Sequence, residues 1–243
     1  MYLTCKYFAN MAINQNTSIY FILSLIVVVT FTFNDAFAIV YHYEPFFTAD
    51  GNTALDVPNS KDLQLTSFTV ATWFKTTGDF PDEGVMVNKG DLRSESADAN
   101  HNYGLWFTSP PNRLQGGFET TGGANRYITL ANNYLDGQWH HGVVTFDNTN
   151  NIVRLFVDCV QISTLSTTSN PDNTGTQPLR IGGNAQSLTE DFFIGQLDEV
   201  CIWNRALTNA EITSLMNNGV FAPNGLVYSN SFGQALSSAP HQL

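Results

Sequence analysis

The sequence predicts an all-β sandwich that ends in one short helix. Short apolar runs alternate along the chain with clusters of Gly, Asn, Asp, Pro, Ser and Thr, which is the pattern of many strands joined by polar turns. With 43% hydrophobic and 13% charged residues, the chain is too apolar to be disordered. One segment alone, near the C-terminus, combines helical spacing of apolar residues with start and stop signals.

The first 38 residues are expected to form a signal peptide. An apolar stretch, residues 19–29, follows Lys6 and precedes the small-residue site Ala36-Phe37-Ala38. Because the stretch is shorter than the roughly 20 residues of a spanning helix, cleavage after Ala38 is favoured over retention as an anchor. Both alternatives place the folded part outside the cytoplasm, secreted or at the cell surface, and cleavage would leave no membrane span.

The expected strands follow in order between turn clusters. Residues 66–75 form the most informative one, because large side chains occur on both of its faces, Phe68 and Phe74 on one and Trp73 on the other. We therefore expect this strand to be central and covered on both sides. The full set of expected strands is 39–47, 54–57, 66–75, 84–88, 103–109, 114–119, 126–130, 139–146, 152–157, 160–165, 179–182 and 192–203.

The last strand leads into a helix over residues 208–218. Thr208 and Glu211 have the spacing of a capping box, in which each side chain bonds the backbone amide of the other. Gly219 suits the left-handed residue that ends a helix. An apolar stripe at helical spacing is formed by Ile212, Leu215 and Met216.

The acidic balance of the chain restricts its partners. The formal net charge is −11, whereas neutralising nucleic-acid phosphates needs a Lys/Arg patch, so we expect no nucleic-acid partner. Neither a Gly-x-Ser-x-Gly elbow nor a phosphate-binding loop occurs in the sequence.

Several segments, taken in order, resemble a LamG-like jelly-roll domain. They are residues 50–58 (DGNTALDVP), 67–75 (SFTVATWFK), 139–147 (WHHGVVTFD), 154–158 (RLFVD), 179–183 (LRIGG) and 198–207 (DEVCIWNRAL). The resemblance implies a two-sheet antiparallel jelly roll of the concanavalin A-like class, and a binding module rather than an enzyme. The domain is expected to cover residues 39–219. Residues 220–243 would be a tail or a closing strand, since 224–228 resemble the opening strand of such a unit.

Two cysteines remain after the leader, which contains Cys5. In an exported domain, Cys159 and Cys201 most simply form one disulfide. The alternative is two buried free thiols, because sequence spacing cannot show that the two β-carbons face each other.

Calcium is the cofactor that we consider. Asp50 and Asn52 offer oxygen ligands on either side of a flexible Gly, and hard cations prefer such oxygens. In similar jelly rolls a calcium ion bridges this opening segment to an Asp of the last strand, which the resemblance places at Asp198. The alternative is an ordinary turn, with Asp198 bonded to local backbone amides.

Glycan binding would use aromatic rings that stack on sugars and polar groups that bond the hydroxyls. In residues 103–107, the alternation of a strand places Trp106 on the opposite face from its neighbours. Trp106, Arg126 and Tyr127 are the candidate ligand-binding residues. The alternative is that Trp106 fills the core between the sheets.

An enzyme is less consistent with the sequence. The carboxylates of Glu190-Asp191 and Asp198-Glu199 are adjacent, so a regular strand would send each pair to opposite faces instead of into one cleft. For the same reason we interpret His140 and His141 as structural. The sequence thus predicts a non-catalytic module that binds extracellular carbohydrate or a surface protein. A structural component of a cell-envelope assembly is the alternative, and a glycoside hydrolase is the least favoured.

Overall fold

The computed structural model describes residues 26–28, 40–42, 46–78, 80–92, 100–109, 111–130, 134–184, 191–219 and 222–232. The chain divides into two compact units, Met1–Tyr43 and Glu44–Leu243. In the first unit, β1 (Ile26–Val28) pairs antiparallel with β2 (Val40–His42). Most of the expected signal peptide and its cleavage site lie outside the described residues.

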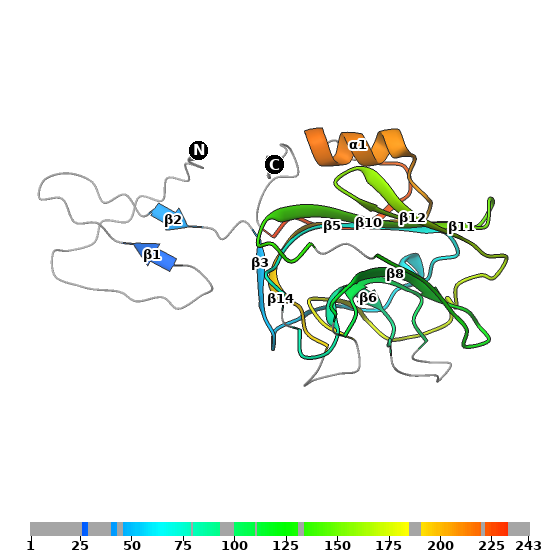
Figure 1. Ribbon diagram of the computed structural model, residues 1–243, viewed down its shortest axis with the longest axis horizontal. Helices are drawn as coiled ribbons and strands as arrows, with labels where there is room; N and C mark the ends of the chain where they lie inside the picture. The colour runs from blue at the N-terminus through cyan, green and yellow to red at the C-terminus, as the bar shows by residue number, and fades with distance from the viewer. Residues whose placement is uncertain are drawn as a thin grey trace, which may run out of the picture. The chain divides into compact units, whose positions relative to one another are not determined.

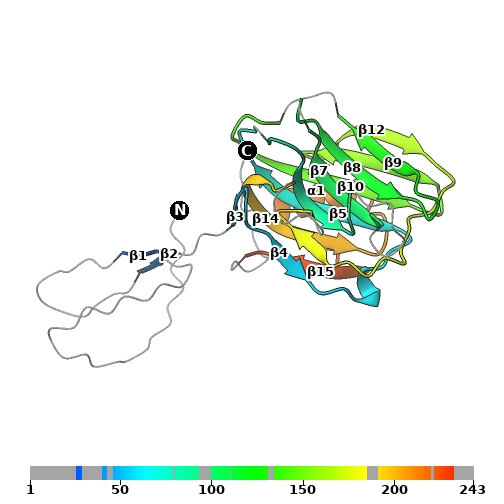
Figure 2. The ribbon, with the colours of Figure 1, turned by 90° about the horizontal axis from the view of Figure 1, so that it is seen from below.

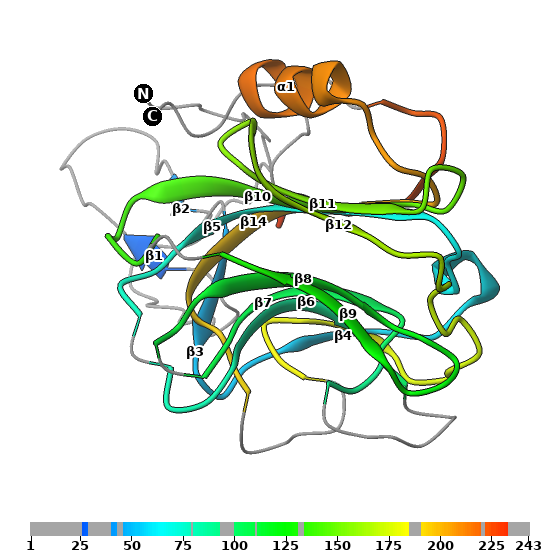
Figure 3. The ribbon, with the colours of Figure 1, turned by 45° about the vertical axis from the view of Figure 1, so that its right-hand side comes forward.

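The second unit is a sandwich of two antiparallel sheets (Figures 1 and 3). One sheet has the order β12-β11-β10-β5-β14-β15, with β3 also paired to β14, and the other has the order β4-β13-β6-β7-β8-β9. The strands of the seven-stranded sheet are β3 (Phe47–Asp50), β5 (Phe68–Lys75), β10 (Trp139–Asp147), β11 (Ile152–Val157), β12 (Val160–Ser166), β14 (Ile194–Trp203) and β15 (Leu226–Asn230). Those of the six-stranded sheet are β4 (Leu55–Val57), β6 (Gly84–Lys89), β7 (Tyr103–Phe107), β8 (Leu114–Glu119), β9 (Asn125–Thr129) and β13 (Leu179–Ile181). A 3-10 helix, η1 (Lys61–Leu63), precedes β5.

The sandwich confirms the predicted fold class, and most strand boundaries agree with the sequence pattern within a few residues. The expected strand over 39–47 is the exception, because its two ends belong to β2 in one unit and β3 in the other. As predicted, β5 is central: it lies between β10 and β14, and every residue except Lys75 is buried. Phe68 and Phe74 pack between the sheets, while Ala71 faces the other side of its sheet.

The helix α1 (Asn209–Asn218) covers the outer face of the seven-stranded sheet (Figures 1 and 3). Its predicted stripe is buried: Ile212, Leu215 and Met216. Ile212 and Leu215 belong to a second apolar cluster, which includes Val143, Phe156 and Trp203 from the strands beneath. The helix begins with the predicted capping box at Thr208 and Glu211 and ends at Gly219, whose φ is 59°.

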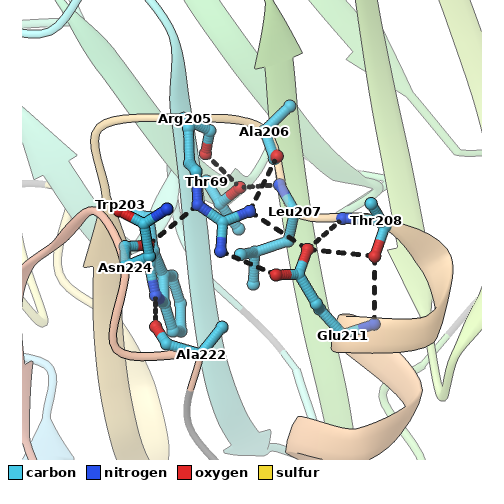
Figure 4. A network of polar contacts seen from close by, with 9 residues as sticks. All are labelled: Thr69, Trp203, Arg205, Ala206, Leu207, Thr208, Glu211, Ala222 and Asn224. Carbon is cyan, nitrogen blue, oxygen red and sulfur yellow. Dashed lines mark hydrogen bonds and ion pairs between the residues drawn. The ribbon is translucent and has the colours of Figure 1, made fainter.

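Arg205 fastens the start of α1 to the rest of the unit (Figure 4). Its Nη2 and Nη1 donate to Glu211 Oε1 and Oε2 at 2.7 and 3.0 Å, and its Nε donates to the carbonyl of Asn224 at 2.8 Å. The Arg205 guanidinium is the main reason that the pKa of Glu211 falls to about 2. This arrangement links the helix cap to the segment that leads into β15.

Residues of the predicted tail return to the sandwich as a closing strand. β15 pairs antiparallel with β14 over Leu226–Asn230, and Trp203 Nε1 donates to the carbonyl of Ala222 at 2.7 Å. Within the described parts of the chain, no helix is long and apolar enough to span a membrane.

The predicted disulfide is wrong, because Cys159 and Cys201 are both free. Cys159 lies in the turn between β11 and β12, where its Sγ is 3.1 Å from Met216 Sδ of the helix, while Cys201 lies in β14. Since β10 and β5 separate β11 from β14, the two cysteines are three strand spacings apart, roughly 14 Å at about 4.8 Å each. A disulfide needs Cα atoms within about 7 Å of each other.

Candidate ligand-binding groove

The two sheets leave a groove between their edge strands, β9 of the six-stranded sheet and β12 of the seven-stranded sheet. These strands lie along the same side of the sandwich (Figure 2). The groove has a volume of about 710 Å³. Its lining comes from β9, from the turn between β10 and β11, and from β12 with the residues that follow: Asn125, Arg126, Tyr127, Asn150, Asn151, Leu165, Ser166, Thr167, Thr168 and Ser169.

Local sequence explains each wall of the groove. The turn between β10 and β11 is held by Asp147, whose carboxylate accepts from the amides of Thr149 and Asn150 and from the Asn150 side chain. Asn151 completes this turn at a φ of 55°, a conformation that Asn tolerates better than most residues. The run Ser166–Ser169 lies beside this turn, with the Thr167 amide donating to the Asn151 carbonyl at 2.9 Å, and adds hydroxyl residues to the wall that faces β9. Hydroxyl and amide groups can each donate and accept hydrogen bonds, so the groove suits a ligand rich in hydroxyls.

Arg126 crosses the groove from β9. Its Nε donates to Thr167 Oγ1 at 3.0 Å and its Nη2 to Ser169 Oγ at 3.1 Å, while its Nη1 donates to the carbonyl of Asn125 at 3.0 Å. The side chain is therefore fixed in position by neutral oxygens from both walls. Among the described residues that line the groove, Arg126 alone is charged.

Trp106 lies on the outer face of the six-stranded sheet, as the strand alternation predicts. Tyr103, Leu105 and Phe107 belong to the core between the sheets, and Trp106 does not. Nevertheless its side chain is only 1% exposed, because its ring centroid is 4.8 Å from that of Tyr127 and 5.2 Å from that of His101. The structure thus brings Trp106 and Tyr127 together, but the indole is not exposed for stacking on a sugar.

Tyr127 connects this aromatic cluster to the groove, because its hydroxyl lies 3.1 Å from His101 Nδ1 and its residue also lines the groove. Burial lowers the pKa of His101 to about 3, so the imidazole is neutral at physiological pH. His101 Nε2 and Trp106 Nε1 are both buried without a hydrogen-bond partner in the structure. Of the three rings in this cluster, only that of Tyr127 belongs to a residue that lines the groove.

A buried polar network extends from this face to the loops at one end of the sheet. Asn184 Nδ2 donates to Asp91 Oδ1 at 2.9 Å and to Asp191 Oδ2 at 3.1 Å, and Asn184 Oδ1 accepts from Asn88 at 2.9 Å. Arg180 Nη1 donates to the Asn184 carbonyl at 2.6 Å. These bonds hold the loops after β6 and β13 against the sheet.

Of the three residues considered for calcium, Asp50 and Asn52 share one turn, and Asp198 lies apart from them. Asp50 pairs with Ile194 across β3 and β14, so Asp198 is four residues further along, roughly 13 Å at about 3.3 Å per residue. Asp50 Oδ1 accepts from the Asn52 amide at 2.9 Å, and Asp198 Oδ1 accepts from the Glu199 amide at 2.7 Å. In the portion that the structure describes, no group of three or more His, Cys, Asp or Glu side chains is arranged to hold a metal ion.

The carboxylate pair Asp198-Glu199 lies at a β-bulge in β14, where Glu199 has a φ of 46°. Both residues are buried, and this burial, reinforced by the charge of Asp198, raises the pKa of Glu199 to about 7. Neither residue lines the groove. In the other pair, Asp191 belongs to the network around Asn184, and Glu190 lies outside the described residues.

The two adjacent histidines of β10 bond neighbouring loops. His140 Nδ1 lies 2.8 Å from Asp158 Oδ2, and its Nε2 lies 3.2 Å from Asp136 Oδ1. The hydrogen bond that His140 makes to the Asp158 carboxylate raises the pKa of His140, against the opposing effect of burial. The charge of Asp158 and the contact with Asp136 raise it further. His141 is buried, with its ring 5.2 Å from that of Trp73.

The prediction from sequence thus named Arg126 and Tyr127 but missed the facing wall of the groove. The sequence signal for this wall is the run of four hydroxyl residues, Ser166–Ser169, directly after the last apolar residue of β12. Nothing in that run indicates that it lies opposite β9.

Solved structures with the same fold include several carbohydrate-related proteins. The CBM40 domain of Ruminococcus gnavus IT-sialidase, bound to α2,3-sialyllactose, aligns with a TM-score of 0.59 and 16% identity over 71% of this chain and 96% of that one. A proposed carbohydrate-binding protein from Bacteroides ovatus aligns at 0.53 and 16% over 76% of this chain, which spans about half (48%) of that protein. A mutant of the NanB sialidase from Streptococcus pneumoniae aligns at 0.55 and 14% over 70% of this chain and 27% of its own.

At these identities the structural likeness concerns the fold alone. A search of curated protein sequences finds none that matches this chain. Residues 49–213 match the Laminin_G_3 family, described as the concanavalin A-like lectin/glucanases superfamily. Since this match covers more than half of the sequence and the strands form a two-sheet antiparallel sandwich, the chain belongs to the Laminin_G_3 family of the concanavalin A-like superfamily.

Proposed function

We propose that this protein is a non-catalytic carbohydrate-binding module whose ligand lies in the groove between β9 and β12. The observation that carries the proposal is the lining of this groove, about 710 Å³ in volume, which consists largely of residues with amide and hydroxyl side chains. Sugars present many hydroxyls that both donate and accept, and such side chains match them. Two fold neighbours, one bound to α2,3-sialyllactose and one described as carbohydrate-binding, support the same function.

The composition of the groove favours binding over hydrolysis. Glycoside hydrolases generally place two carboxyl groups about 5 to 9.5 Å apart across the scissile bond. The ten lining residues that the structure describes include no Asp or Glu. The proposal therefore assigns recognition to this site and no bond cleavage.

The N-terminal segment directs the proposal to glycans outside the cytoplasm. Its apolar stretch and small-residue site suit export, and export would expose the groove to polysaccharides or to glycans of a cell surface. We include secretion or surface display in the proposal for this reason. A signal peptide cleaved after Ala38 would be seen as a mature N-terminus at Ile39 by mass spectrometry.

Binding to a broad glycan array tests the proposal. Thr168 is exposed in the groove wall, so Thr168→Trp should fill the groove and abolish binding without disturbing the core. Thr53→Trp, at an exposed position in the loop between β3 and β4, is the matched control and should bind as the original protein does. Binding that survives Thr168→Trp would place the ligand elsewhere, and silence of the original protein on the array would contradict carbohydrate recognition.

A further inference from the structure

We infer that the groove selects glycans that carry an anionic group, a carboxylate or a sulfate, and that Arg126 binds this group. The inference rests on the proposed function and specifies its ligand class. It follows from the hydrogen bonds of the Arg126 guanidinium, from its charge environment and from its position between the two walls.

The Arg126 guanidinium is held in place by hydrogen bonds, but not all of its N–H groups are used. Arginine has five N–H groups, one on Nε and two on each terminal nitrogen. Arg126 uses one on each nitrogen, toward Thr167 Oγ1, Asn125 O and Ser169 Oγ. One N–H therefore remains on Nη1 and one on Nη2. Two N–H groups of a planar guanidinium match the two oxygens of a carboxylate or sulfate.

In the described part of the chain, no carboxylate lies within ion-pair distance of the Arg126 guanidinium. Among the described residues it forms no ion pair, whereas Arg180 pairs with Asp56 and Arg205 pairs with Glu211 at 2.7 Å. All three acceptors of Arg126 are neutral oxygens. A cation that is oriented by neutral groups keeps its full charge for a ligand.

The rest of the chain makes this charge more significant. The protein has 21 acidic and 10 basic residues and a formal net charge of −11, so an anion is repelled by most of its surface. An acidic glycan therefore needs a local cation to be held. In the groove this cation lies among side chains that can bond sugar hydroxyls at the same time.

The geometry also separates the acidic group from the rest of the sugar. Arg126 is anchored at the β9 wall by Asn125 and at the facing wall by Thr167 and Ser169. The amides of Asn150 and Asn151 and the hydroxyl of Thr168 lie along the remaining lining. A glycan whose anionic group binds Arg126 would thus present its hydroxyls to these neutral groups.

The test compares acidic glycans with forms of the same glycans in which the charge is masked. Every glycan bound on the array is measured as the native form, as the methyl ester of its carboxylates and, where it carries sulfate, as the desulfated form. Masking the charge should weaken binding about 10- to 100-fold, the usual effect of a charge-assisted hydrogen-bond pair. The two treatments distinguish a carboxylate from a sulfate as the group that binds.

Substitutions of Arg126 provide the second arm. Arg126→Gln should remove the preference for the charged form, so that native and masked glycans bind equally. Arg126→Lys should retain part of the preference, because it keeps the positive charge but lacks the planar guanidinium that can make two parallel hydrogen bonds. Arg113→Gln, at an exposed position outside the groove, is the matched control and should keep the preference. A melting curve for each variant shows whether the protein is folded.

The outcomes are distinct. If neutral glycans bind as tightly as acidic ones, or if Arg126→Gln retains the preference for charge, the inference is wrong and carbohydrate binding stands. If no glycan binds at all, both the proposed function and this inference are wrong. The comparison of masked and native glycans tests the selectivity for charge without any variant. If Arg126→Gln does not fold, Arg126→Lys tests the role of the guanidinium, and an unchanged preference in that variant contradicts the inference.

Discussion

Replacing Glu211 by Gln isolates the charge that fixes the start of α1. Gln keeps the shape of Glu and suits the capping box, but it cannot form the ion pair with Arg205. In the folded protein the pKa of Glu211 falls from 4.5 to about 2, chiefly through Arg205 and then through its bonds to Thr208. Its carboxylate accepts from the Thr208 amide at 2.8 Å (Figure 4).

The size of the effect follows from this shift. A change of about 2.5 pKa units corresponds to about 3.4 kcal/mol when it is fully expressed. Because the side chains of Arg205 and Glu211 are 28% and 31% exposed, solvent screening reduces this to about 1–1.5 kcal/mol. For a folded unit of about 200 residues, Glu211→Gln should therefore lower Tm by about 2–6 °C at pH 7.

The pH dependence tests the cause. A carboxyl whose pKa is lowered on folding stabilises the protein above its unfolded pKa, near 4.5, and loses this contribution as pH falls toward 2. Urea unfolding of the original protein and of Glu211→Gln should thus differ at pH 7 and converge between about pH 5 and pH 2.5. Asp62→Asn removes an exposed carboxylate elsewhere and serves as control. Equal stabilities at pH 7, or a difference that persists unchanged at pH 2.5, would refute this reasoning.

Three further predictions concern other parts of the unit. Folding raises the pKa of His140 above 6.5, so its protonated form stabilises the protein below that pH. This contribution is lost as the pH rises through the folded pKa. In urea unfolding, His140→Gln should therefore be less stable than the original protein at pH 6 and equally stable at pH 9. Asn184→Ala removes the hydrogen bonds of a buried amide and should cost about 3 kcal/mol in the same assay, with a loss below about 1 kcal/mol contradicting the network. Since Asp198 lies four residues along β14 from the partner of Asp50, the two should not share one calcium ion; Asp198→Ala should therefore leave any calcium-dependent change in Tm unaltered, and loss of that change in the variant would contradict this expectation.

The features that sequence predicted well depend on local interactions. The capping box at Thr208, the end of the helix at Gly219 and the alternation around Trp106 each involve residues close in sequence, and all three occur in the structure. Local pattern also gives most strand boundaries, because turn residues such as Asn151 mark where strands must stop. The family resemblance supplied the way in which these strands are arranged as two sheets.

The features that it missed depend on which strands become neighbours and in what register. The sequence allows Cys159 and Cys201 to form a disulfide, but the sheet order places β10 and β5 between β11 and β14. Asp50 and Asp198 do belong to paired strands, β3 and β14, yet the register sets them four residues apart. Trp106 faces outward as expected, but whether an outward side chain is covered depends on Tyr127 and His101, which come from other segments.

The groove has one wall on each sheet, and this has a consequence for how a ligand could be found. Strand edges are where a sandwich opens first, so the backbone amides of β9 and β12 should exchange with deuterium sooner than those of β5. A molecule bound in the groove to residues of β9 and to the residues that end and follow β12 would join the two edges and slow this opening in proportion to its occupancy. Hydrogen exchange confined to these two strands could therefore serve as a screen for ligands of unknown identity, independent of any label on the glycan.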